Sequence, residues 1–187
     1  AKESLQKAVE ANPLDAKAHV RLAQFLGHEQ DYSASLKEID KALEISATDI
    51  DALSTKADVF SAKNDYKAAV AVLDKIKSSH PDNPGAYYKL GQIYQAQKDY
   101  DRAIREFEQA LDKSPNAFEP LAAVVSVYLA QNNADKAIAK LNGIIKSAPT
   151  NAAAHKLLGE IYFSQRKFDE ADKSFLRAIE ITPRWNI

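Results

Sequence analysis

The chain has 187 residues, with 25 Lys and Arg against 26 Asp and Glu, so its formal net charge is −1. This balance argues against a nucleic acid or another polyanion as the principal partner. The absence of cysteine excludes a disulfide framework, a thiolate nucleophile and a cysteine-based metal site. No apolar run approaches the ~18 residues needed to cross a bilayer, so we expect no membrane insertion of this segment.

The first predicted element is a helix over residues 1–11, which ends before Pro13 because proline cannot continue a helix. Pro13 starts a ladder of prolines with a spacing of 34 residues, in which Ala47 occupies the one mark without proline. The later prolines are Pro81, Pro115, Pro149 and Pro183. A large apolar residue stands eight residues before every mark: Leu5, Ile39, Leu73, Phe107, Leu141 and Phe175. The chain is therefore an internal repeat with a period of 34 residues.

Each later period is predicted to hold two helices. In the third full period Tyr87, Leu90 and Tyr94 share one helix face, and Ala103 and Phe107 share another beyond a short polar turn. We therefore predict an incomplete repeat over 1–15, full repeats over 16–49, 50–83, 84–117, 118–151 and 152–185, and the start of a further repeat at 186–187.

Small residues recur at fixed phases of the period. Gly91 and Gly159 lie on predicted first helices, and Ala103 and Ala171 lie on predicted second helices. Short side chains at these phases indicate that the two helices of a repeat cross closely. An aromatic residue beside each glycine, such as Tyr94 or Tyr162, is expected to fill the space next to the crossing.

These columns resemble the tetratricopeptide repeat, whose pattern is Trp-x2-Leu-Gly-x2-Tyr, then Ala-x3-Phe-x2-Ala, then Pro. The third full repeat carries Tyr87, Leu90, Gly91, Tyr94, Ala103, Phe107, Ala110 and Pro115. The fifth carries His155, Leu158, Gly159, Tyr162, Ala171, Phe175, Ala178 and Pro183. The resemblance implies an all-α fold, a right-handed α-solenoid of antiparallel helix-turn-helix repeats that forms a single array over residues 1–187.

The resemblance also implies a non-enzymatic scaffold or adaptor that binds a peptide or helix of another protein in a concave groove. The groove positions that the resemblance gives, carried over one by one, are Val20, Gln24, Ser54, Asp58, Tyr88, Gln92, Gln95, Ser126, Leu129, Lys156, Glu160 and Phe163. Tyr88, Leu129 and Phe163 are the apolar points, and Tyr88 is expected to be the main anchor. The Lys/Asn/Arg clamp of the family's chaperone-binding members is missing, which disfavours a chaperone adaptor.

The sequence motifs do not support a hypothesis that the chain is an enzyme or that it binds a metal or a cofactor. The chain has no Gly-rich phosphate loop and no nucleophile elbow. Its four histidines, His19, His28, His80 and His155, lack the spacing of metal ligands and are expected to be packing or loop residues. We predict no catalytic residue, no metal and no cofactor.

Two alternatives to partner binding stay open at this point. The segment could be a structural spacer of a larger scaffold, or an RNA-binding helical repeat. An RNA-binding repeat would need rows of basic residues along the helices, which the sequence lacks. Because the chain starts and stops within repeats, we expect it to be part of a longer protein. Its uncapped ends are then expected to expose Leu5 and Val9 at one end and Phe175, Ile179 or nearby residues at the other, with Trp185 loosely held. Such ends could self-associate end to end.

Overall fold

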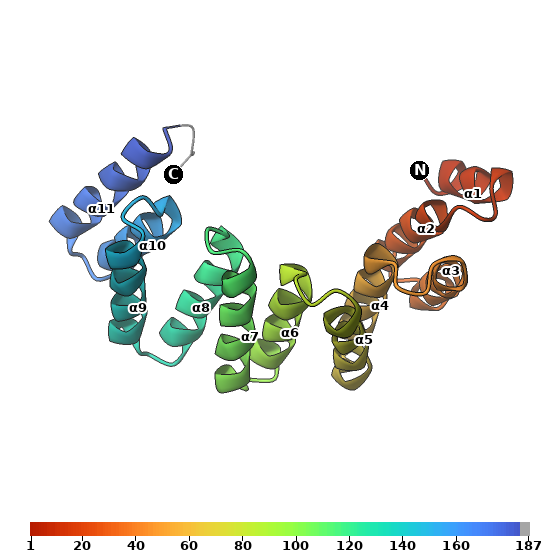
Figure 1. The fold of residues 1–187 in the computed structure, drawn as a ribbon, viewed down its shortest axis with the longest axis horizontal. Coiled ribbons are helices and arrows are strands. Elements are labelled where there is room, and N and C mark those ends of the chain that lie inside the picture. The colour runs from red at the N-terminus through yellow and green to blue at the C-terminus, as the bar shows by residue number, and fades with distance from the viewer. Residues whose placement is uncertain (184–187) are drawn as a thin grey trace. The chain divides into compact units, whose positions relative to one another are not determined.

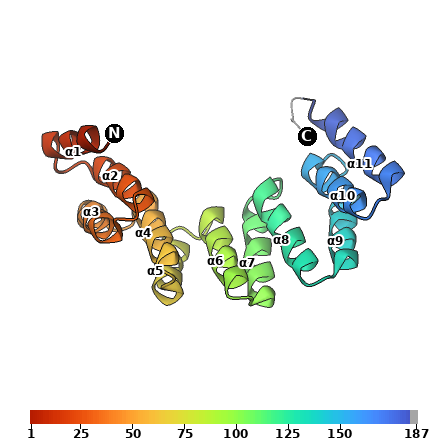
Figure 2. The same cartoon turned by 180° about the vertical axis from the view of Figure 1, so that it is seen from behind.

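The computed structural model describes residues 1–183 and is all-α over that range, with eleven helices and no strand (Figure 1). The helices are α1 (Lys2–Ala11), α2 (Ala16–His28), α3 (Tyr32–Ile45), α4 (Ile50–Ala62), α5 (Tyr66–Ser79), α6 (Pro84–Ala96), α7 (Tyr100–Lys113), α8 (Phe118–Ala130), α9 (Ala134–Ser147), α10 (Ala152–Ser164) and α11 (Phe168–Ile181). Each second helix ends two residues before its predicted mark, so the predicted helix-turn-helix repeats are confirmed. Figures 1 and 2 show that short turns join the successive helices.

The chain divides into two compact units, Ala1–Ile93 and Tyr94–Ile187. In the first unit, Ala23, Ile39 and Val59 form one apolar cluster between α2, α3 and α4. In the second unit, a larger cluster joins α8, α9 and α10 around Leu141 and Leu158. Each unit is thus held together by contacts between neighbouring hairpins, as expected of a repeat protein.

The predicted apolar column of the second helices forms the centre of this packing. Ile39, Leu73, Phe107 and Leu141 are all fully buried, whereas Leu5 in α1 and Phe175 in α11, the outermost described helices, are half-buried. The close crossing is also present: a Cβ placed on Gly159 would lie 2.7 Å from two ring atoms of Phe175. Helices α10 and α11 can therefore approach only because position 159 has no side chain.

The helices begin at side-chain caps that recur with the repeat. Asp31, Asp65, Asp99 and Asn133 each accept a hydrogen bond from the third backbone N–H beyond them, and these residues open α3, α5, α7 and α9. Asp15, Asp49, Asn83 and Asn151 do the same for first helices. Because such a bond satisfies an otherwise unpaired N–H, each cap stabilises its helix by about 1 kcal/mol. Ala117 before α8 and Lys167 before α11 make no such bond.

One residue in each turn within a hairpin adopts a left-handed backbone, with φ between 55° and 62°. These residues are Gln30, Asn64, Lys98, Asn132 and Arg166. Left-handed angles are costly for residues other than glycine and are tolerated best by asparagine. The sequence alone does not predict this feature, because no glycine stands at any of the five positions.

The outermost described helices expose part of their apolar surface, as predicted. In α1 no residue is fully buried, and Leu5 and Val9 are half-buried. In α11 Ile179 is 42% exposed and the neighbouring Leu176 is 60% exposed, whereas Phe175 is half-buried. Trp185 lies outside the described residues. Within residues 1–183, no helix combines the length and apolar character needed to span a membrane.

Candidate functional site

The candidate site consists of equivalent positions on the first helices α2, α4, α6, α8 and α10, here called the first-helix face. They are positions two, five, nine, twelve and thirteen of each repeat, counted from residues 16, 50, 84, 118 and 152. All five side chains at position nine are exposed: Gln24, Asp58, Gln92, Ser126 and Glu160. The five at position thirteen are also exposed: His28, Ala62, Ala96, Ala130 and Ser164. Because each first helix repeats the same packing, each presents the same two positions to solvent.

Four polar side chains of this face form hydrogen bonds or ion pairs between neighbouring first helices, and two of their partners, Thr55 and Lys89, lie outside the face positions. Three pairs join residues 31 apart in sequence: Gln24 Nε2 donates to Thr55 Oγ1 at 3.3 Å, Lys89 Nζ pairs with Asp58, and Gln95 Nε2 donates to Ser126 Oγ at 3.2 Å. A glutamine that donates once keeps its amide oxygen and a second N–H for other partners. The face therefore presents oriented donors and acceptors rather than freely rotating side chains.

Val20 departs from the prediction. Its side chain is only 4% exposed and packs with Ala42 and Ala52 in the core of the first unit, so it does not belong to the surface. Position five lies at the border of the packed face, where a short branched apolar side chain turns inward. At the same position of α10, Lys156 is half-buried and places its ammonium 5.0 Å from the Phe118 ring centroid.

The other predicted residues lie at the surface to different degrees. Ser54, Tyr88, Gln95 and Lys156 are half-buried. Lys156 also approaches Glu160 at 3.8 Å, one helical turn along α10. Tyr88 therefore offers only part of its ring to a partner, which weakens its standing as the main anchor.

The most exposed apolar points of the face lie in the second unit. Leu129 is 40% exposed and Phe163 is 60% exposed, and both occupy position twelve of their helices. The Phe163 ring meets the Phe168 ring edge-on, with centroids 5.7 Å apart and an interplanar angle of 66°. Since this arrangement is a favourable one for aromatic pairs, the two rings hold each other in place at the surface.

In the first unit the face contains a hollow between α2 and α4. Its lining includes the predicted Gln24 and Asp58, together with His28, Tyr32 and Thr55. Tyr32 and Thr55 lie outside the positions that the family resemblance supplied. Thr55 is only 6% exposed, and Gln24 reaches it from the face through a hydrogen bond that sequence spacing alone does not reveal.

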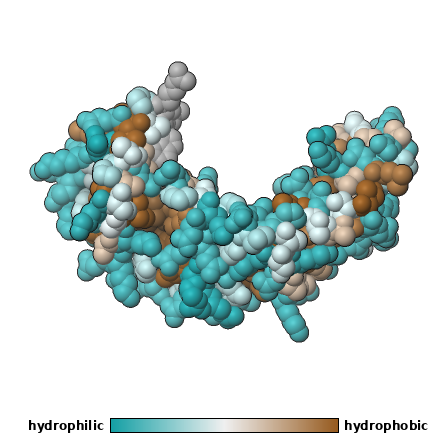
Figure 3. Space-filling view, in the orientation of Figure 1, coloured by the Kyte–Doolittle hydropathy of each residue, from teal (hydrophilic) through white to brown (hydrophobic). Residues whose placement is uncertain are grey.

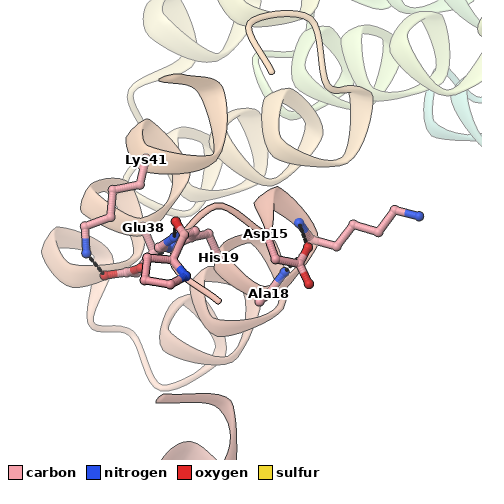
Figure 4. A network of polar contacts seen from close by, with 7 residues as sticks. Asp15, Ala18, His19, Glu38 and Lys41 are labelled. Atoms are coloured by element: carbon pink, nitrogen blue, oxygen red, sulfur yellow. Dashed lines mark hydrogen bonds and ion pairs between the residues drawn. The ribbon is translucent and has the colours of Figure 1, made fainter. Parts of the chain in front are cut away.

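The histidines serve the packing, as predicted for His19 and His155. His19 is 2% exposed; its Nδ1 lies 2.6 Å from Glu38 Oε2, and its Nε2 lies 3.0 Å from the Pro13 carbonyl oxygen (Figure 4). His155 Nε2 contacts the Pro149 carbonyl oxygen at 3.1 Å in the same way. The Tyr87 hydroxyl donates to the Pro81 carbonyl oxygen at 3.0 Å from the same repeat position. A polar ring thus takes over the place of the family's tryptophan.

The carboxylate beside His19 is electrostatically tuned. Partial burial raises the pKa of Glu38, but hydrogen bonds from Lys41 and His19 outweigh it and hold that pKa below its ordinary value. Figure 4 shows Lys41 and His19 converging on this carboxylate. Within residues 1–183, no three His, Cys, Asp or Glu side chains gather in a way that could hold a metal ion.

Comparisons with known proteins support the repeat assignment. Family models described as tetratricopeptide repeat match almost the whole sequence: one model matches residues 28–93, 60–127, 94–158 and 128–185, and a second matches residues 1–50. A search of curated protein sequences gave no match.

Solved structures of the same fold are numerous. YrrB, reported as a TPR protein with an unusual peptide-binding site, has a TM-score of 0.60 and 23% identity, covering 98% of this chain and 95% of that one. Yeast Tom70 has a TM-score of 0.74 and 18% identity, covering 97% of this chain and 39% of that one. Pseudomonas aeruginosa PilF has a TM-score of 0.67 and 20% identity, covering 97% of this chain and 82% of that one. At these identities the likeness concerns the fold.

Proposed function

Because this chain belongs to the tetratricopeptide repeat family, we propose that it is a non-enzymatic scaffold that binds a peptide or helix of another protein on its first-helix face. The family and the fold support a protein-interaction repeat scaffold in general terms. The 34-residue register runs unbroken through both compact units, so we treat residues 1–187 as one repeat array.

The observation that carries the proposal is the row of exposed position-nine side chains, one on every first helix. Four of the five, Gln24, Asp58, Gln92 and Glu160, offer amide or carboxylate oxygens, and the fifth offers a hydroxyl. An extended peptide needs acceptors for its backbone N–H groups and donors for its carbonyls. Amide side chains can supply both, and the bonds between neighbouring first helices restrict the motion of some of them before a partner arrives, which lowers the entropy cost of binding.

The apolar anchors come from the second unit. Phe163 is the most exposed large apolar residue of the face, and Leu129 lies at the same position one repeat earlier. Buried aromatic side chains commonly dominate interface energy. Phe163 is already held against Phe168, so it would lose little freedom on binding.

Charge on the face favours protein over RNA as the partner. Asp51, Asp58, Glu119 and Glu160 stand among the position-two and position-nine side chains and would repel a phosphate backbone. No stripe of Lys or Arg runs along the same positions. A protein partner, which brings both donors and acceptors, suits this mixture better.

The test begins with capture of partners on the longest available form of the protein, followed by mass spectrometry and an affinity measurement on each candidate. Phe163→Ala should weaken binding of the partner by ~2 kcal/mol, which is about thirtyfold in Kd. Leu176→Ala is the matched control, because Leu176 is also 60% exposed but lies on a second helix.

The outcomes separate the alternatives. If the segment is only a spacer, neither substitution changes the affinity of any partner. If the partner is RNA, affinity falls steeply with salt, and removal of one apolar ring has a smaller effect. Equal weakening by Phe163→Ala and Leu176→Ala would remove the first-helix face as the binding surface.

A further inference from the structure

A second groove lies in the first unit, between α1, the turn after it and α3, here called the α1–α3 groove. Val9, Pro13, Leu14 and Ile45 form its apolar lining, and Glu10 and Glu44 line it as well. Leu14 is 77% exposed and Ile45 is 39% exposed. Figure 3 shows hydrophobic residues, next to hydrophilic ones, at the surface of the end that α1 to α3 form.

The chain contains an internal reference for this groove. Leu111, Asp112, Pro115, Asn116 and Ser147 line a groove between α7 and α9 and lie 102 residues, or three periods, after the corresponding residues of the α1–α3 groove. In the later groove Lys140 Nζ pairs with Glu108 Oε1 at 2.6 Å and so ties α9 to α7. The corresponding residues in the first unit are Gln6 and Glu38, which cannot form such a pair.

The same repeat position therefore carries different chemistry in the two units. Leu14 corresponds to Thr48, Asp82, Asn116 and Thr150, which are all polar. Ile45 corresponds to Ser79, Lys113 and Ser147 in the next three repeats, and isoleucine returns only at Ile181. Since the other repeats fold with polar residues at these places, the hairpin itself does not require Leu14 or Ile45. Neighbouring exposed apolar residues that the fold does not require indicate an interaction surface.

The charge around the α1–α3 groove is mainly negative, because Glu10 and Glu44 line it and Lys41, which lines it too, is paired with Glu38. Glu10 and Glu44 are exposed, and neither carboxylate has an ion-pair partner within residues 1–183. The Lys41 ammonium in the lining lies 2.9 Å from Glu38 Oε1 and is engaged there. The residue that corresponds to Glu44 in α9 is Lys146, so the acidic rim is also particular to the first unit.

We propose that the α1–α3 groove is a second interaction surface, which binds a protein segment through two adjacent apolar side chains and a neighbouring Lys or Arg. The apolar side chains cover Leu14 and Ile45, and the basic group lies between Glu10 and Glu44. This surface involves α1, α3 and their turn, whereas the first-helix face of the same unit involves α2, α4 and α6. A partner can therefore occupy one surface without using the residues of the other.

The test uses a random peptide library displayed on phage, selected on the intact chain. The double variant Leu14→Asn/Ile45→Ser replaces both residues by those at positions 116 and 147, so the fold is expected to tolerate it. Peptides enriched on the wild-type chain should pair two apolar residues with a Lys or Arg. Their Kd should rise about tenfold or more in the double variant. Glu44→Lys, which copies Lys146, should also weaken them, and more so at low salt.

Two controls make the result decisive. Phe163→Ala should leave these peptides unaffected, which separates this surface from the first-helix face. Melting curves should show that the double variant is folded. Enriched peptides that bind the double variant as tightly as wild type, or that carry acidic rather than basic residues, would overturn the proposal. So would a wild-type dimer that the double variant abolishes in sedimentation, because the occupant would then be a second copy of the chain.

Discussion

The close crossing of α10 and α11 leads to a quantitative prediction for Gly159→Ala. The new Cβ would lie 2.7 Å from Phe175 Cδ1 and Cε1 and 3.1 Å from Cγ. Because Cγ is fixed to the backbone of α11 through a single methylene group, the ring cannot move away without shifting its helix or leaving its place. Overpacking of this kind costs about 1–3 kcal/mol of unfolding free energy. Replacing a helical glycine by alanine returns ~1 kcal/mol, so the net loss should be at most about 2 kcal/mol.

Gly143→Ala is the matched control in α9. A Cβ at position 143 meets no heavy atom within 4 Å, so this variant should gain the ~1 kcal/mol of helix propensity without any packing cost. The difference between the two variants then isolates the crossing, at about 1–3 kcal/mol. In a chain of this length each kcal/mol moves the melting temperature by roughly 2–4 °C.

Thermal unfolding followed by circular dichroism measures both variants. Gly143→Ala should melt above wild type, and Gly159→Ala at or below it. Adding Phe175→Leu to Gly159→Ala should recover part of the loss, since a smaller side chain relieves the contact. If both alanine variants melt above wild type by the same amount, the glycine at position 159 is not needed for helix packing.

Three further predictions concern single residues, all measured by urea-induced unfolding. Ala117→Asn should stabilise the chain by ~1 kcal/mol, because Ala117 already has the extended backbone of a cap residue but no side chain to accept the bond; an unchanged midpoint would contradict this. Lys98→Gly should stabilise by ~0.5 kcal/mol by relieving a φ of 61°, whereas Lys98→Ser should stay within ~0.5 kcal/mol of wild type; a destabilised glycine variant would refute the strain. The lowered pKa of Glu38 means that its ionised form adds stability above its ordinary value of 4.5, which is lost as pH falls through the lower folded value. Glu38→Gln should therefore reduce the loss of stability on acidification, and an unchanged pH profile would exclude this role.

The fold could be predicted almost completely because the repeat is exact. Once the 34-residue period is fixed, Pro81 and Pro115 are each expected to end a helix, because proline cannot continue one. Leu73 and Phe107 stand at the same repeat position, so both are expected to face the neighbouring helices in the same way. Both expectations depend only on nearby residues and on the repeat period. Such expectations transfer from one repeat to the next without knowledge of the rest of the molecule.

The surface was less predictable because its geometry depends on neighbours outside the repeat. Position five was expected to face a groove, yet Val20 packs inward beside Ala42 and Ala52 while Lys156 extends over Phe118. The hydrogen bond from Gln24 to Thr55 depends on the offset between two neighbouring first helices. The sequence of a single repeat does not determine that offset. Left-handed turn residues such as Lys98 were missed because the conformation is imposed by the helices on either side rather than favoured by the residue itself.

The bonds to the proline carbonyls bear on how the chain responds to mechanical load. His19, Tyr87 and His155 each hold the carbonyl of the proline six residues earlier and so pin the turn that leads into their repeat. At the same position the second and fourth repeats have Leu53 and Leu121, whose side chains cannot form a hydrogen bond. Pinned and unpinned turns therefore alternate along the sequence. Under a stretching force, the turns before residues 53 and 121 are therefore expected to open more easily than the turns before residues 19, 87 and 155, because they lack this hydrogen bond.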